Sequence, residues 1–158
     1  MTDMTLAEAR LFVHEHLAEG VQCPACGQRA KIYPRTIHAT MARELIHIYR
    51  TQGTGWFHLP SVIGHNGGDV TKCRYWGLLQ EDDARREDGG RAGHWRLTGL
   101  GVDFVKGRVS VAKHAHLYNG KLLGLTGDQV RITDCLGKKF NYAVLMGAPV
   151  PITGLEAA

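Results

Sequence analysis

The sequence predicts an α+β protein, with most helices before residue 107 and antiparallel strands after it. Between residues 5 and 107, apolar residues recur at helical spacing behind residues that suit a helix start. From Val109 onward the apolar period changes to two, which is typical of a half-buried strand. Tyr118-Asn-Gly-Lys121 then supplies a hairpin turn, because both central residues of this turn type need positive φ.

Residues 1–39 contain one expected helix and one cysteine turn. Thr5-Leu-Ala-Glu8 is a capping box, in which the Thr and Glu side chains satisfy free N–H groups at a helix start. We expect a helix over residues 5–19, ended by Gly20. Cys23-Pro-Ala-Cys-Gly27 is a tight turn, and residues 30–33 form a short strand that Pro34 ends.

Residues 40–107 contain a series of shorter elements. Each begins at a capping residue, at a proline or in an apolar run, and glycines separate most of them. In order, they are a helix from Thr40 to about residue 51, a short helix over 60–63, a turn over 65–68, a helix from Asp69 to Trp76, strands over 78–81 and 94–97, and a helix from Thr98 to Gly107.

Residues 108–147 are expected to form a small antiparallel β unit. Its strands are predicted within 109–117, 122–125, 130–133 and 140–146, with turns at 126–128 and 136–138. Residues 148–158 contain Pro149 and Pro151 and are expected to be a flexible tail. The predicted organisation is therefore 1–39, 40–107, 108–147 and 148–158.

Two stretches within residues 40–107 carry a family resemblance. They are GDVTKCRYWGLL, which starts at Gly68, and HWRLTGLGVDFVKG, which starts at His94. Their order resembles the winged helix-turn-helix of bacterial transcription regulators of the MarR and PadR types. In those families a Gly-Leu-Ile/Val turn follows the third helix, and an Arg-Leu-Thr-x-x-Gly segment returns from the wing. The resemblance implies a winged-helix core over 40–107. The whole chain, with its Cys-Pro-x-Cys turn, also loosely resembles small phage and prophage proteins.

The expected third helix separates into two faces. Val70, Cys73, Trp76 and Gly77 fall on one side and are predicted to be core. The side chains on the other face are expected to contact DNA. In a DNA groove, Lys or Arg side chains contact guanine acceptors or phosphates, and Thr contacts a phosphate or a thymine methyl group. The predicted DNA-binding residues, from the turn, the helix and the wing, are Asn66, Thr71, Lys72, Arg74, Tyr75, Arg85, Arg86 and Arg91. From the second helix, Arg43 and Arg50 are expected to face the DNA backbone.

The charge distribution favours an anionic partner without requiring one. The net charge is +4, and residues 31–80 hold six lysines and arginines against two acids. The wing loop over 82–93, however, holds four acids against three arginines. The sequence therefore predicts a non-catalytic double-stranded DNA-binding protein, a bacterial or phage transcription regulator. The alternative is an adaptor or inhibitor that binds a protein through the same surface.

The cysteine turn predicts a structural zinc site. Cys23 and Cys26 have the spacing of a zinc knuckle, in which two thiolates grip one Zn²⁺. His114 and His116 lie two apart in a strand, so they share a face and are the expected histidine ligands. A degenerate knuckle with free thiols and a redox pair remain open. Further candidate ligands are Cys135 and His38.

The remaining patterns exclude several classes of protein. No run of eighteen apolar residues and no secretory signal is present, so we expect a cytoplasmic protein without a membrane span. The motifs of serine hydrolases, phosphate-binding loops and zinc proteases are missing, so no catalysis is expected. An open strand edge in the β unit suggests a homodimer.

Overall fold

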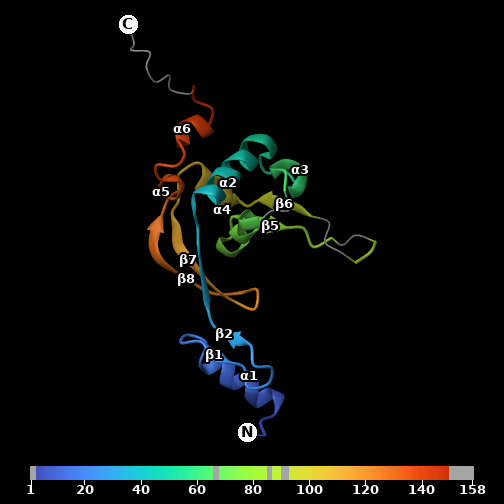
Figure 1. The fold of residues 1–158 in the computed structure, drawn as a ribbon. Coiled ribbons are helices and arrows are strands. Elements are labelled where there is room, and N and C mark those ends of the chain that lie inside the picture. Colours follow the sequence, from blue (N-terminus) through green and yellow to red (C-terminus); the bar gives the residue numbers. More distant parts are fainter. Residues whose placement is uncertain (1–2, 66–67, 85–86, 90–92, 150–158) are drawn as a thin grey trace. The chain divides into compact units, whose positions relative to one another are not determined.

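The structure is a computed structural model that describes residues 3–65, 68–84, 87–89 and 93–149 (Figure 1). It combines helices with antiparallel strands, so the predicted α+β class is confirmed. The chain forms two compact units, one made of Met1–Thr36 and His114–Thr126 and the other of Ile37–Lys113 and Gly127–Ala158. None of the described helices has both the length and the apolar character needed to cross a membrane.

The first helix, α1 (Leu6–Glu15), begins as predicted. The Thr5 hydroxyl accepts a hydrogen bond from the Glu8 N–H at 3.2 Å, and the Thr5 N–H donates to the Glu8 carboxylate at 2.8 Å. This capping box confirms the predicted helix start. The helix ends at Glu15 rather than near residue 19, and Gly20, with a φ of 82°, closes the turn that follows it.

Five strands lie in the first unit or extend from it. They are β1 (Val21–Gln22), β2 (Arg29–Ala30), β3 (Tyr33–Thr36), β7 (Val111–Tyr118) and β8 (Lys121–Val130), and β7 lies between β3 and β8 in one sheet. β1 and β2 form a hairpin around the cysteine turn. The prediction that Pro34 ends a strand is wrong, because Pro34 lies inside β3 opposite His116. β3 is an edge strand, where proline's missing N–H breaks no ladder hydrogen bond.

The turn between β7 and β8 confirms the predicted hairpin. Asn119 and Gly120 have φ values of 51° and 71°, as the sequence pattern requires. β8 then runs without interruption to Val130, so the predicted turn at 126–128 and the separate strand over 130–133 are wrong. Gly127 takes a φ of 93° within the strand, which glycine tolerates without ending it.

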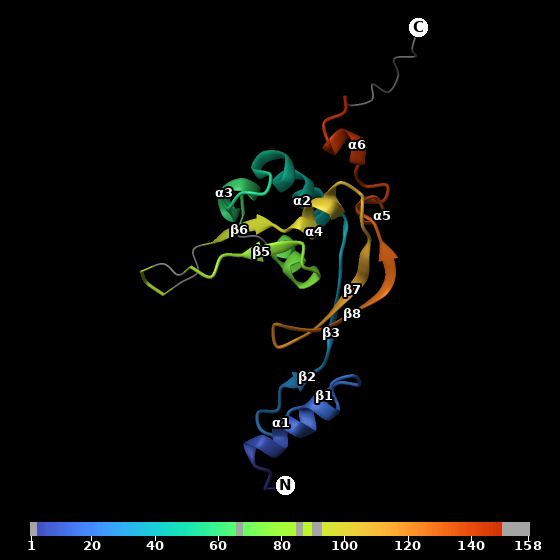
Figure 2. The ribbon, with the colours of Figure 1, turned by 180° about the vertical axis from the view of Figure 1, so that it is seen from behind.

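The second unit is built around α2 (Ala39–Gln52). Its other elements before β7 are β4 (Phe57–His58), α3 (Leu59–Ile63), the 3₁₀ helix η1 (Gly68–Trp76), β5 (Leu79–Glu81), β6 (His94–Leu97) and α4 (Gly99–Val105). β6 lies between β4 and β5 in an antiparallel sheet. η1 lies beside β5 and also packs against α2, which in turn packs against α3 (Figures 1 and 2). His38, not Thr40, is the N-cap residue of α2, and it makes no side-chain cap.

The predicted third helix is present as a 3₁₀ helix rather than an α-helix. Val70, Cys73 and Trp76 are buried, as predicted, and they lie three residues apart. That spacing places all three on one side of a helix with three residues per turn. The Trp76 indole N–H donates to the Ala112 carbonyl at 2.7 Å, which fixes the end of η1 in the core. Gly77 is exposed, so its predicted place on the core face is wrong.

The chain after β8 is helical, so the prediction of strands there is wrong. α5 (Ile132–Leu136) buries its first and last residues, four apart, in the core of the second unit. The Asp134 carboxylate accepts the Arg131 N–H at 2.8 Å at its start. α6 (Tyr142–Leu145) replaces the strand predicted over 140–146. Short apolar runs fit either period, and packing against α2 selects the helix here.

A close backbone approach joins the start of α4 to the end of η1. The Thr98 hydroxyl accepts the Gly101 N–H at 2.9 Å, as the predicted cap requires, and donates to the Gly77 carbonyl at 2.5 Å. The Thr98 N–H donates to the Leu78 carbonyl at 3.1 Å. A Cβ on Gly101 would lie 2.1 Å from the Leu78 carbonyl oxygen, so only glycine fits at this position.

Gly101→Ala is expected to destabilise the protein. The added methyl group must displace the Leu78 backbone, and such overpacking costs about 1–3 kcal/mol. Gly99→Ala is the matched control, because a Cβ there meets no atom within 4 Å, and it should leave the free energy of unfolding equal or higher. Urea unfolding of both variants measures the difference, and equal stabilities would contradict the close approach.

Candidate functional site

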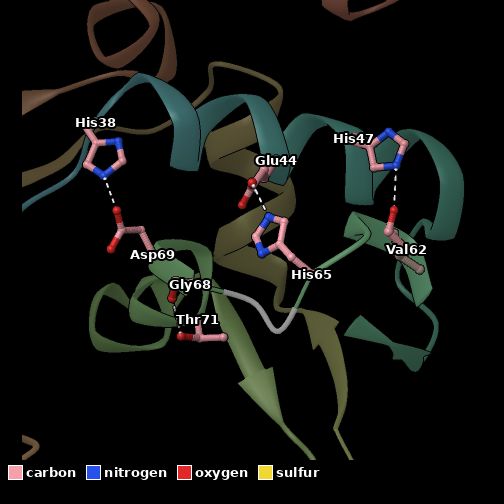
Figure 3. Close-up of polar contacts among 8 residues, drawn as sticks. All are labelled: His38, Glu44, His47, Val62, His65, Gly68, Asp69 and Thr71. Carbon is pink, nitrogen blue, oxygen red and sulfur yellow. Dashed lines mark hydrogen bonds and ion pairs between the residues drawn. The ribbon is translucent and has the colours of Figure 1, made fainter. Parts of the chain in front are cut away.

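Three histidine contacts tie α2 to the segment that contains α3 and η1 (Figure 3). His38 Nε2 lies 3.0 Å from Asp69 Oδ2 at the start of η1, and His47 Nε2 lies 3.1 Å from the Val62 carbonyl in α3. His65 Nε2 lies 3.1 Å from Glu44 Oε1. Carbonyl and ionised carboxylate oxygens only accept, so each histidine donates from Nε2. Contacts on both sides of residues 66–67 therefore hold η1 against α2.

Glu44 is the one buried charged residue among those the structure describes, with an exposed fraction of 9%. Burying a carboxylate is costly unless it is hydrogen-bonded, and His65 supplies that bond. Sequence reasoning missed this role for His65, and also those of His38 and His47. The one sequence signal that relates to these roles is that Glu44 and His47 lie three residues apart, on one face of the same helix.

Arg74, a predicted DNA contact on η1, is engaged within the protein. Its guanidinium donates to Glu81 Oε2 at 3.2 Å and to the Tyr75 hydroxyl at 3.0 Å. It also lies over the Tyr75 ring, 4.9 Å from the centroid. The Glu81 carboxylate offsets the charge of Arg74, and Tyr75 is held beside it.

Lys72 is the cation of η1 that the structure leaves available. It is partly exposed and has no ion-pair partner within the described part of the chain. Thr71, one residue earlier, donates its hydroxyl to the Gly68 carbonyl at 2.8 Å. The other predicted contacts, Asn66, Arg85, Arg86 and Arg91, lie outside the described residues.

Arg43 and Arg50, expected to face DNA from α2, contact the C-terminal segment instead. The Arg43 guanidinium lies 5.0 Å from the Phe140 ring centroid, and Arg50 donates to the Leu145 carbonyl at 3.0 Å. Both line a hollow of about 630 Å³ that Glu44 also lines. Both side chains are therefore engaged by residues of the C-terminal segment.

The structure brings Cys23 and Cys26 together in the turn between β1 and β2. The Cys23 N–H donates to the Gln28 carbonyl at 2.7 Å, and the Gly27 N–H donates to the Cys23 carbonyl at 2.8 Å. Hydrogen bonds from the backbone N–H groups of Cys26 and Ala25 lower the pKa of the Cys23 thiol. Cys26 is exposed. This turn has the geometry that stabilises a thiolate.

The histidines predicted as zinc ligands have other contacts. His114 Nδ1 lies 2.9 Å from the Thr36 hydroxyl on β3, and His116 hydrogen-bonds to the Thr126 hydroxyl on β8. Within the described ranges, no three His, Cys, Asp or Glu side chains gather in a metal-binding arrangement. The structure therefore pairs the two cysteines of the turn without adding His114 or His116 to them.

The other two cysteines lie in the second unit, where Cys73 is part of the core and Cys135 is partly exposed. Cys73 is fully buried, and burial raises the pKa of its thiol. Burial also raises the pKa of Cys135 to about 11, with a contribution from the neighbouring Asp134 carboxylate. Neither thiol is suited to metal binding or nucleophilic chemistry at neutral pH.

Comparisons of the chain with protein-family models, with characterised proteins and with solved structures gave no match.

The four thiols are expected to separate into two reactivity classes. At pH 7.5, with a chelator present to remove metal ions, iodoacetamide should modify Cys23 and Cys26 first. Both thiols are accessible, and backbone N–H groups favour the Cys23 thiolate. Cys73 should react only on unfolding because it is fully buried, and the partly exposed Cys135 should react more slowly than the turn cysteines because its pKa is raised. Mass spectrometry of timed digests measures the order, and early modification of Cys73 would contradict it.

Proposed function

We propose that the second unit is a winged-helix domain that binds double-stranded DNA, in a non-catalytic transcription regulator of bacterial or phage origin that acts in the cytoplasm. The order α2–β4–α3–η1–β5–β6, with β6 between β4 and β5, supports this proposal. A winged helix has this order: three helices, a short strand after the first of them, and a hairpin after the third. In such a domain η1 enters the major groove, as recognition helices do.

The anchoring of η1 supports the same proposal. Helices that read DNA must present side chains from a fixed position, and His38, Thr98 and Trp76 all fix the ends of η1. Lys72 then supplies the cation for a phosphate or a guanine. Tyr75, held by Arg74, offers a ring and a hydroxyl beside it.

A protein partner is the second candidate, and one surface feature favours it. Trp56 has an exposed fraction of 45%, and the Arg96 guanidinium lies 4.6 Å from its ring centroid. Arg96 also donates to the Gln80 side chain on β5 at 2.9 Å. Exposed Trp and Arg side chains are enriched among residues that dominate protein interfaces.

Lys72→Ala is expected to weaken duplex binding and to reduce its salt dependence. Removing one phosphate contact lowers the slope of log K against log salt by about one. Lys138→Ala is the control, because Lys138 is exposed on the second unit outside η1 and should leave the slope unchanged. Arg74→Ala is a poorer test, since it also leaves Glu81 without this ion pair.

Fluorescence anisotropy with random duplex DNA at several salt concentrations measures both variants. Equal affinities and slopes for Lys72→Ala and the unaltered protein would overturn the assignment of η1 as the recognition helix. Absence of duplex binding at low salt would instead favour the protein partner, and Trp56→Ala would then be the variant to compare in partner binding.

A further inference from the structure

The turn that contains Cys23 and Cys26 has no role in the proposed DNA binding. Cys23 and Cys26 lie in the turn of the β1–β2 hairpin, and both line the same hollow. This is the arrangement that holds two thiolates on one zinc ion. A zinc ion in a structural site takes four ligands, so the turn provides half of a site.

The described ranges of the chain do not bring the other half to this turn. All nine histidines and all four cysteines lie in the described ranges, and no three metal-binding side chains gather anywhere within those ranges. Cys73 is buried in the core of the second unit, and Cys135 lies in the same unit, away from the turn in sequence. Histidines engaged through a ring nitrogen are His16, His38, His47, His58, His65, His114 and His116.

We propose that two copies of this chain share one Zn²⁺, with Cys23 and Cys26 of each copy as the four ligands. A two-fold axis through the metal makes the two turns equivalent, as in most homodimers. Four thiols lose four protons to solvent as the Zn²⁺ binds, and no electron is transferred. The site is incomplete in one copy and complete in two.

The surroundings of the turn suit this arrangement. Arg10, Arg29 and Lys31 line the same hollow of about 470 Å³ as the two cysteines, and their charges offset the net negative charge of a zinc ion with four thiolates. Apolar surface adjoins it. Leu6, with an exposed fraction of 59%, lines this hollow and a neighbouring one together with Met4 and Pro24. A second copy would remove this surface from water.

The full-length chain tests the proposal through metal content and mass together. Purified with Zn²⁺, it should bind about one Zn²⁺ per two chains and sediment as a dimer. EDTA should return it to a monomer reversibly. Co²⁺ in place of Zn²⁺ should give the intense sulfur-to-metal absorption of a four-thiolate tetrahedral site.

Variants identify the ligands. Cys26→Ser should lose both the metal and the dimer, while circular dichroism stays unchanged because Cys26 is exposed on a turn. Cys135→Ser should keep both. His14→Ala should also keep both, although His14 lines the same hollow as the cysteines and is a candidate ligand for a site within one chain.

Three results would overturn the proposal: about one Zn²⁺ per monomeric chain, no zinc binding, or a zinc-dependent dimer that survives Cys26→Ser.

Lys72→Ala should leave the zinc content and the dimer unchanged, since Lys72 lies on the second unit. Loss of DNA binding without loss of the dimer therefore separates a failure of the proposed function from a failure of the shared zinc site.

Discussion

The burial of α2 is the constraint on which the second unit depends. Met41, Leu45, Ile46 and Ile48 are all almost fully buried, and they face in several directions around the helix. A helix that is apolar on most sides is stable only when other elements enclose it. α3, η1, α4, α5 and α6 do so, although they come from distant parts of the sequence. The same enclosure buries Glu44, which His65 then has to satisfy.

Enclosing α2 also decides which charges remain for a partner. The C-terminal helices cover one part of α2 and engage Arg43 and Arg50 through a ring and a carbonyl. On η1, Arg74 is engaged by Glu81 on β5. Lys72 is left on the same helix without such a contact in the described part of the chain. The basic excess of residues 31–80 is therefore largely a set of internal contacts, and a nucleic-acid surface here depends on few side chains.

Signals that act within a few residues were predicted well. The capping box at Thr5, the cap at Thr98 and the positive φ values at Asn119 and Gly120 all appear where the sequence places them. Each is satisfied by a backbone group only one to three residues away, so no distant contact can alter it. The cysteine turn belongs to the same class, because Cys23 and Cys26 meet through their own backbone.

The sequence by itself determined the α+β class, the helix starts at Thr5 and Thr98, the β7–β8 turn and the placing of Cys23 and Cys26 in one turn. Tertiary structure decided that η1 is a 3₁₀ helix and that residues 132–136 and 142–145 are helical. It also decided that three histidines tie α2 to the segment that contains α3 and η1, and that Arg74 pairs with Glu81. The physical reason is that a short apolar run fits both the helical period and the strand period. The partner of a side chain also depends on which distant surface packs against it.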